Sequence, residues 1–134
     1  MSDWHKNCFY RVSLKALIRN QAGEILLVRE KGDLGLPGGG WDYGESVHDT
    51  LRRELNEEIG LTSEFTERVV GTAERWLEHK QAWLLWIVYE IRYEALDYSI
   101  GNHGEELVWV SEADINMTIP SGPMIKKVLK EMRQ

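Results

Sequence analysis

Apolar and polar residues alternate between positions 10 and 18. One face of this stretch carries Tyr10, Val12, Leu14, Ala16 and Ile18. The opposite face carries Arg11, Ser13 and Lys15. A period of two predicts a β-strand with one buried face. Turn-forming residues 20–23 and a compact apolar run at 25–28 follow, and together they predict a hairpin.

A helix is predicted shortly after a glycine-rich segment. Residues 31–40 hold several glycines and Pro37, which indicates a loop. Ser46 and Asp49 form a capping-box-like pattern, so the helix is expected to begin at Ser46. An apolar stripe then recurs at i, i+4 and i+8, and Gly60 supplies a left-handed stop.

The remaining chain predicts three more strands and a final helix. Residues 68–73, 82–91 and 107–110 have strand character, and Pro123 suits the first turn of a helix. The buried face of that helix is expected to hold Met124, Ile125, Val128, Leu129 and Met132. Strands, helix, strands and helix in this order predict an α/β fold in which helices cover a mixed sheet.

Composition narrows the class of protein. The 134 residues fit one domain spanning 1–134, and 43% hydrophobic residues suffice for a core. A net charge of -6 argues against a partner that is a nucleic acid polymer, because such binding needs a basic face. A phosphorylated small molecule that arrives with its own cations remains a suitable partner.

The sequence predicts neither a targeting segment nor a membrane span. The single cysteine, Cys8, has no partner for an internal disulfide, which favours a reducing compartment. Residues 1–11 hold no apolar signal core, and the longest apolar run, 82–89, is far shorter than the about 20 residues that span a bilayer. We therefore expect a cytoplasmic protein with no membrane association. The sequence itself leaves both a monomer and a homodimer open.

Three carboxylates share one face of the first predicted helix. Glu54, Glu57 and Glu58 are spaced at i, i+3 and i+4 behind the glycine-rich loop. They repel one another unless a positive group lies among them, and a divalent metal is the simplest such group. A metal held by carboxylates suggests phosphate chemistry. The alternative for any one of these glutamates is an ordinary solvated helix face.

Residues 39–61 resemble the signature of the Nudix (MutT-like) hydrolase family. That signature reads G-x5-E-x7-R-E-U-x-E-E-x-G-U, where U is a bulky aliphatic residue. The matching positions here are Gly39, Glu45, Arg53, Glu54, Leu55, Glu57, Glu58, Gly60 and Leu61. So many fixed positions at fixed spacing make a specific signal. The resemblance implies an α/β/α sandwich around a central mixed β-sheet.

The resemblance also implies an activity and a cofactor. Members hydrolyse a nucleoside diphosphate linked to another group, with Mg²⁺ or Mn²⁺. The first expectation for this chain is a nucleoside triphosphate pyrophosphohydrolase acting on a small nucleotide. The alternatives are a nucleotide-sugar hydrolase and a non-catalytic nucleotide-binding domain on the same fold. A binding domain could dispense with the glutamates, whereas this chain keeps them.

The resemblance assigns roles within the motif. Glu57 and Glu58 are expected to bind metal, and Glu54 is either a ligand or the general base. The carbonyl of Gly38 is a further expected ligand. Arg53 joins the catalytic group by orienting a carboxylate, although on its own it would be read as a surface salt bridge.

Other candidates lie at the edges of the motif and beyond it. Gly39, Glu45 and Gly60 are expected to be structural residues that hold the loop and helix together. The acidic pair Glu105 and Glu106 precedes the predicted strand 107–110. Related enzymes often carry a metal ligand or catalytic glutamate on a loop in this region, so either residue could serve, against the alternative of a solvated loop carboxylate.

Aromatic residues are the candidates for substrate binding. The chain holds six Trp and five Tyr against two Phe, and Trp and Tyr can stack on bases. Tyr43, in the motif loop, and Trp76 are the expected contacts. Trp83 and Trp86 differ by an odd number, so they should face opposite sides of a strand, one of them in the core. Packing is the alternative role for each Trp.

Overall fold

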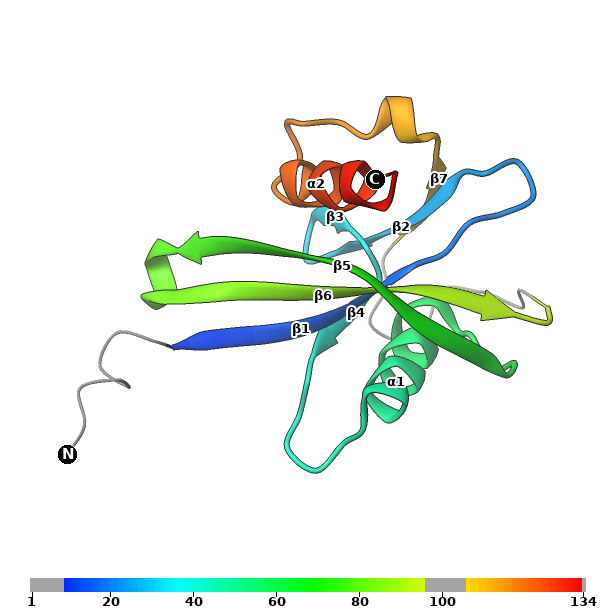
Figure 1. The fold of residues 1–134 in the computed structure, drawn as a ribbon, viewed down its shortest axis with the longest axis horizontal. Helices are drawn as coiled ribbons and strands as arrows, with labels where there is room; N and C mark the ends of the chain where they lie inside the picture. Colours follow the sequence, from blue (N-terminus) through cyan, green and yellow to red (C-terminus); the bar gives the residue numbers. More distant parts are fainter. Residues whose placement is uncertain (1–8, 96–105, 134) are drawn as a thin grey trace.

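The computed structural model describes residues 9–95 and 106–133 (Figure 1). In chain order these residues form β1 (Tyr10–Leu17), β2 (Ile25–Glu30), β3 (Asp33–Gly35), β4 (Gly38–Gly40), α1 (Val47–Ile59), β5 (Phe65–Leu77), β6 (Ala82–Tyr93), β7 (Glu106–Val110) and α2 (Gly122–Met132). Short 3-10 turns, η2 (Glu78–Lys80) and η3 (Glu112–Asp114), follow β5 and β7. Neither α-helix in these two ranges is long and apolar enough to cross a membrane.

The strands form two sheets. The first has the order β4-β1-β6-β5, with β1 and β6 parallel and the other neighbours antiparallel. The second is antiparallel, with the order β3-β2-β7. Helices α1 and α2 lie on opposite sides of the first sheet (Figure 1). The predicted α/β class, with a mixed sheet between helices, is confirmed.

The predicted hairpin forms only beside its turn. The amide of Gly23 donates to the carbonyl of Asn20 at 3.0 Å, and Arg19 and Ile25 make an isolated antiparallel bridge. Beyond that bridge β1 and β2 diverge into different sheets, because β1 pairs with β4 and β6 instead. The prediction that 31–40 is entirely loop is also wrong, since β3 and β4 lie within it and pair through their backbones.

The ends of α1 follow the predicted signals. The Ser46 hydroxyl accepts a hydrogen bond from the Asp49 amide at 3.0 Å, and the Asp49 carboxylate accepts one from the Ser46 amide at 3.5 Å. Gly60 closes the helix in the left-handed region with φ 66°. These local caps set the helical phase, and that phase decides which residues face β1 and β4.

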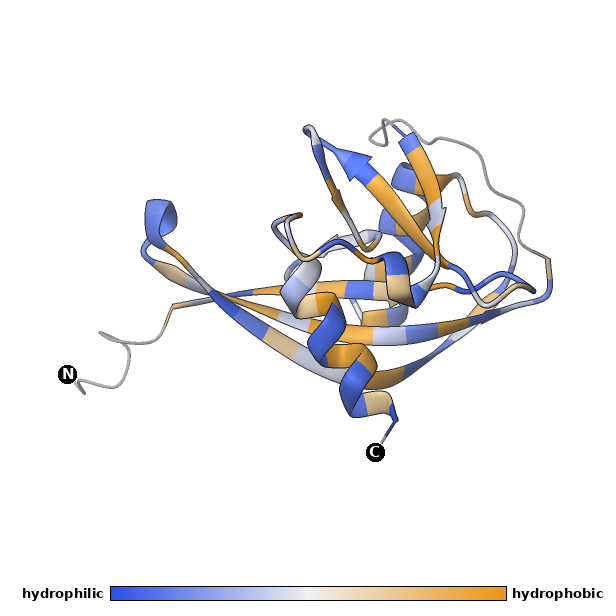
Figure 2. Cartoon of the chain, turned by 90° about the horizontal axis from the view of Figure 1, so that it is seen from above, coloured by the Kyte–Doolittle hydropathy of each residue, from blue (hydrophilic) through white to orange (hydrophobic). Residues whose placement is uncertain are grey.

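Two apolar cores lie on opposite faces of the first sheet. The core on the α1 side includes Leu14, Ala16, Ile18, Leu51, Leu55 and Ile59. The core on the α2 side includes Leu17, Trp86, Val88, Met124, Ile125, Val128 and Leu129. Figure 2 shows apolar residues running along the strands and alternating with polar ones on α2. The predicted buried face of α2 is confirmed, apart from the half-buried Met132.

Both faces of β1 are covered, so the prediction of one buried face is wrong. Leu17 is buried in the core on the α2 side, and Ser13 is buried as well. The Lys15 side chain lies over the Trp86 ring rather than in open solvent. The reason is that β1 is an inner strand of a sheet packed on two sides, which the sequence of one strand does not reveal.

Candidate active site

The backbone of β4 passes close to two neighbouring groups because its residues are glycines. Gly38 has φ 134°, and a Cβ there would lie 2.1 Å from the Leu14 carbonyl oxygen. A Cβ on Gly39 would lie 2.5 Å from Oε1 of Glu54. Both distances are too short for a side chain, so only glycine lets β4 fit between β1 and the acidic face of α1.

Glu58 is buried at the end of α1 and reaches back to β4. Its Oε1 accepts a hydrogen bond from the Gly38 amide at 2.5 Å. Burial raises the pKa of Glu58 to about 9, and a hydrogen bond with the Glu30 carboxyl adds to this rise. The Gly38 amide and the nearby Lys15 ammonium act in the opposite direction. Glu58 therefore favours its protonated form unless a cation compensates its charge.

Lys15 lies beside this carboxyl pair. Its Nζ donates to the Gly38 carbonyl at 3.3 Å and lies 5.4 Å from the centre of the Trp86 ring. Burial lowers the pKa of Lys15, while Glu58, Glu30 and Glu54 favour the charged form. Lys15 thus places an amine, whose charged form the three glutamates favour and burial disfavours, beside the acidic face.

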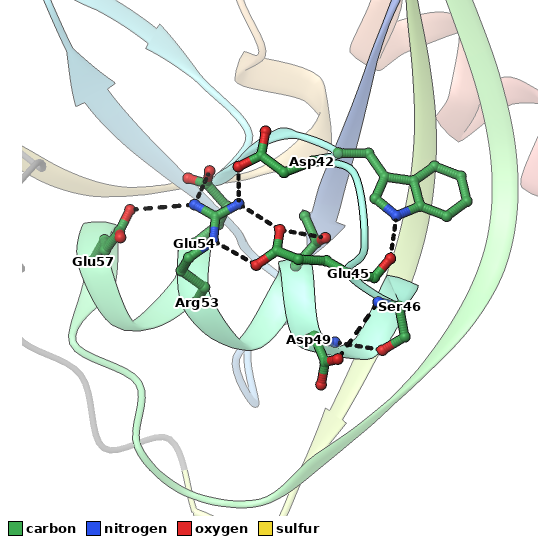
Figure 3. Close-up of polar contacts among 9 residues, drawn as sticks. Asp42, Glu45, Ser46, Asp49, Arg53, Glu54 and Glu57 are labelled. Carbon is green, nitrogen blue, oxygen red and sulfur yellow. Dashed lines mark hydrogen bonds and ion pairs between the residues drawn. The ribbon is translucent and has the colours of Figure 1, made fainter.

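Glu54 and Glu57 occupy the outer side of the same face. Burial raises the pKa of Glu54, whereas Arg53, whose Nη1 donates to Glu54 Oε1 at 2.9 Å, acts against the rise. The same Nη1 lies 3.7 Å from Oε2 of Glu57. Arg53 therefore touches both glutamates that its helix presents beside β4 (Figure 3).

Arg53 also fixes the loop that leads into α1. Its Nε and Nη2 donate to the two carboxylate oxygens of Glu45, each at 2.9 Å, and Nη2 lies 3.3 Å from Asp42 (Figure 3). Glu45 accepts a further hydrogen bond from the Thr50 hydroxyl at 3.1 Å. These hydrogen bonds lower the pKa of Glu45, and the bond with Arg53 has the largest effect. A two-point contact between guanidinium and carboxylate holds loop and helix in one geometry.

A cleft of about 280 Å³ opens beside the buried carboxyls. Lys15, Glu30 and Glu58 form its polar part. Leu84 and Trp86 add an apolar wall, and Arg75, Ser121 and Met124 line the side toward α2. The cleft therefore joins a charged end, able to bind phosphates or cations, to an apolar part, able to accept a flat ring.

The predicted substrate contacts lie outside the residues that line this cleft. Tyr43 is fully exposed in the loop before α1. Trp76 packs edge-on against Trp83 with ring centres 5.6 Å apart, and its indole donates to Glu78 at 2.5 Å. The buried Trp86 lines the cleft instead, and Trp83 is exposed, as the odd spacing of these two residues predicts. Substrate binding by Tyr43 and Trp76 stays a prediction.

Of the acidic pair Glu105 and Glu106, only Glu106 lies within the described residues. Glu106 opens β7 on the surface, and its Oε2 lies 3.3 Å from the Arg29 guanidinium. It does not line the cleft. Glu105 lies outside the described residues. A role for either carboxylate in the site stays a prediction.

Three charged residues of the cleft were not singled out from the sequence. Lys15, Glu30 and Arg75 come from three different strands. The one available signal was a charged residue inside or directly after an apolar strand pattern, as at Lys15 and Glu30. Charged residues in such positions are ordinarily predicted to face solvent. Only the pairing of the strands shows that they lie close together.

The NUDIX domain model matches residues 9–131 of this sequence. The chain belongs to the Nudix family. This Nudix chain is 31% identical over 119 residues to an RNA pyrophosphohydrolase from Vibrio cholerae, which covers 85% of the chain and 66% of that protein. It is 32% identical over 108 residues to an RNA pyrophosphohydrolase from Ruthia magnifica, covering 79% of the chain and 51% of that protein. The chain thus spans between half and two thirds of these curated relatives' length.

Solved structures give the same family and fold. The MutT protein from Methanosarcina mazei Go1 superposes with a TM-score of 0.78 at 28% identity, covering 95% of this chain and 98% of that one. The predicted family and the sandwich fold around a mixed sheet are confirmed. The close approach of Gly39 to Glu54 and the bidentate Arg53–Glu45 pair are therefore contacts between residues of the Nudix motif in this chain.

The donor groups of the site suit the divalent cation that Nudix hydrolases use. Among residues 9–95 and 106–133, no three acidic, His or Cys side chains already stand in position to hold a metal. The chemistry nevertheless fits. Carboxylate oxygens are hard ligands, and burial raises the pKa of both Glu54 and Glu58. A bound cation would offset the cost of ionising these partly buried carboxyls.

Proposed function

We propose that this chain is a Mg²⁺-dependent hydrolase, with Mn²⁺ as an alternative cation, that cleaves a phosphoanhydride bond of a nucleoside triphosphate. The observation that carries the proposal is the acidic face of α1, Glu54, Glu57 and Glu58, held against β4 beside a cleft. A phosphoanhydride resists hydrolysis because its anionic oxygens repel a nucleophile. A protein that cleaves it must gather positive charge at one place.

The motif residues have different roles in the proposed reaction. Glu57 and Glu58 hold the cation, and Glu54 is either a third ligand or the base that takes a proton from the attacking water. When bound, a divalent cation neutralises phosphate charge and activates water. Arg53 keeps Glu54 and Glu57 in place and clamps Glu45. The Gly38 carbonyl, a further proposed ligand, accepts from Lys15 in the structure.

The cleft is the proposed seat of the nucleotide. Trp86 and Leu84 give a ring-sized apolar wall, and Arg75, the register partner of Leu84 on β5, adds a guanidinium group beside it. Arg75 is itself held by a hydrogen bond of 2.8 Å to the Pro120 carbonyl, which joins β5 to the turn before α2. Tyr43 and Trp76 remain proposed contacts for parts of a substrate that extend beyond the cleft.

The relatives favour a second candidate substrate. The RNA pyrophosphohydrolases named above suggest the 5′-triphosphate end of an RNA, which carries the same kind of bond. A net charge of -6 weighs against long contact with an RNA backbone, so we place the free nucleotide first. Nucleotide sugars come next. A binding-only domain is disfavoured by the complete set of glutamates.

A substrate panel tests the proposal. The protein with Mg²⁺ is incubated with nucleoside triphosphates, a short 5′-triphosphorylated RNA and nucleotide sugars, and released pyrophosphate, phosphate and nucleotide are measured. We expect turnover of free triphosphates that EDTA abolishes. Turnover of the RNA alone would replace the first candidate by the second. Turnover of none would leave the binding-only domain as the better reading.

Glu57→Gln tests the acidic face directly. We expect a rate loss of roughly hundredfold or more, because an amide is a much weaker ligand for a hard cation. Circular dichroism should show that the fold is retained, since Glu57 is partly exposed. The control is Glu64→Gln, an exposed carboxylate paired with Arg52, which should keep the wild-type rate. Near wild-type activity of Glu57→Gln would remove this residue from the cation site.

A further inference from the structure

Arg75 lies beside the apolar wall of the cleft. It is the register partner of Leu84 on β6, so the two side chains point to the same face of the first sheet. Its Nη1 donates to the Pro120 carbonyl at 2.8 Å, which ties the guanidinium group to the turn before α2. Arg75, Leu84 and Pro120 all line the cleft. The guanidinium group is therefore held in place at the apolar part of the cleft.

The register of the strands places Arg75 far from the acidic end of the cleft. Lys15 pairs with Val88 on β6, whereas Arg75 pairs with Leu84, four residues earlier on the same strand. Four residues of strand span about 13 Å, and the two strand spacings from β1 through β6 to β5 add about 10 Å sideways. Phosphates bound at the acidic end would therefore leave Arg75 to the part of a nucleotide farthest from them, which is the base.

The Arg75 guanidinium group offers two further donors to a ligand. Nη1 is used by the Pro120 carbonyl, while Nε and Nη2 make no hydrogen bond to any residue in 9–95 or 106–133. Two parallel N–H donors match two adjacent acceptors that lie in one plane. Guanine offers such a pair in its O6 and N7 atoms. Adenine places an amino donor where guanine has O6, so one donor of the arginine would stay unpaired.

We infer that Arg75 selects guanine: its Nε and Nη2 donate to O6 and N7 of the base of a guanosine triphosphate whose ring lies against Leu84 and Trp86. The inference deepens the proposed function and rests on it for the binding of the phosphates at the acidic end. It makes Arg75 a specificity-determining residue. An arginine that contacted phosphate would instead favour every nucleoside triphosphate to the same extent.

Base analogues test this contact on the wild-type chain. The value of kcat/KM with Mg²⁺ is measured for GTP, ATP, inosine triphosphate and 7-deaza-GTP. We expect GTP and inosine triphosphate, which both carry O6 and N7, to exceed ATP by roughly five- to hundredfold, the discrimination typical of a two-point contact with guanine. 7-deaza-GTP, which lacks the N7 acceptor, should lose much of this advantage. Equal values for GTP and ATP, or for GTP and 7-deaza-GTP, would overturn the inference.

Arg75→Met tests the residue itself, because it removes the donors and keeps a long side chain. The loss in kcat/KM should fall mainly on GTP and bring the ratio of GTP to ATP to about one. The control Arg68→Met removes an exposed arginine of the same strand, which pairs with Glu90, and should keep the wild-type ratio. Equal losses for GTP and ATP in Arg75→Met would assign Arg75 to phosphate binding or to holding the Pro120 turn, against the inference.

Nucleotide binding separates this inference from the proposed function. Dissociation constants of GMP and AMP with Mg²⁺ are measured by isothermal titration for the wild type and for Arg75→Met, and we expect the wild type alone to prefer GMP. Turnover of triphosphates without any preference for guanine would defeat the inference alone. A preference for GMP that Arg75→Met abolishes, in a protein that turns over no triphosphate, would defeat the proposed function alone. Neither binding nor turnover of any nucleotide would overturn both.

Discussion

At Gly39 the absence of a side chain decides where Glu54 can lie. All three terminal atoms of Glu54 would be within 2.7 Å of a Cβ at this position. The conflict is with the end of a flexible side chain, so the glutamate can turn away while the backbone stays in place. Gly39 is therefore needed for the position of Glu54, the proposed ligand or base, more than for the stability of the fold.

Gly39→Ala should separate rate from stability. We expect hydrolysis to fall by roughly ten- to hundredfold, because Glu54 is displaced by about an ångström from its working position, with little change in the melting temperature. Gly71→Ala is the matched control, since its Cβ would meet Val128 in the core at 3.2 Å, away from the acidic face. That variant should alter stability rather than rate. Full activity of Gly39→Ala would show that the glycine is not required for Glu54.

Single residues differ in how much the sequence reveals of them. Glu54, Glu57 and Glu58 could be placed together because helical spacing is local. Glu30 and Lys15 could not, since each reaches the site from a strand and meets Glu58 only through tertiary packing. The sequence therefore predicts the acidic face but misses the groups that tune its charge.

On the scale of elements, α1 is fixed at its start by a charged clamp as well as by its cap. Glu45 receives Nε and Nη2 of Arg53 and the hydroxyl of Thr50. Within the loop before α1, the Trp41 indole donates to the Glu45 carbonyl at 2.8 Å. Arg53 thus links the loop to the carboxylates that follow it on the helix.

Arg53→Lys tests this link between loop and helix. A lysine has no planar fork and loses the two-point contact with Glu45. We expect a rate roughly ten- to hundredfold lower from misplacement of Glu54 and Glu57. The neighbouring Arg52→Lys serves as control, because Arg52 pairs with the exposed Glu64 on the outer side of α1. Equal rates for both variants would mean that the clamp does not act on the site.

Elements with local signals were predictable, and elements defined by their partners were not. The caps of α1 and the apolar face of α2 lie within about fifteen residues of sequence each, which suits pattern reading. β3 and β4 are short, and all three residues of β4 are glycine. Such segments become strands only because β1 and β2 offer them backbone partners.

On the scale of the whole molecule, the cleft is assembled from segments far apart in the chain. Its lining comes from β1, β2, β3, β5, β6 and the start of α2, so both sheets contribute. The acidic helix lies on the opposite side of the first sheet from α2, yet Glu58 reaches the same cleft beside β4 (Figure 1). The proposed nucleotide site depends on this assembly, and for that reason the motif alone predicts a reaction class but not a nucleotide.

The buried Glu58 makes the stability of the metal-free molecule depend on pH. Its pKa rises from an ordinary 4.5 to about 9 in the folded state. Between these values the folded chain holds a proton that the unfolded chain has lost, so the free energy of unfolding falls as the pH rises. The lowered pKa of Lys15 acts in the opposite direction at pH values below its ordinary pKa of 10.5.

Urea unfolding in EDTA, from about pH 6 to about pH 8, should reveal this dependence as a difference between wild type and Glu58→Gln. The wild type should lose up to about 1.4 kcal/mol per pH unit relative to the variant, which has no proton to exchange. Saturating Mg²⁺ should remove the loss, because the cation binds the ionised carboxylate and stabilises the folded state. Parallel pH profiles for the two proteins in EDTA would show that Glu58 is ionised in the metal-free fold.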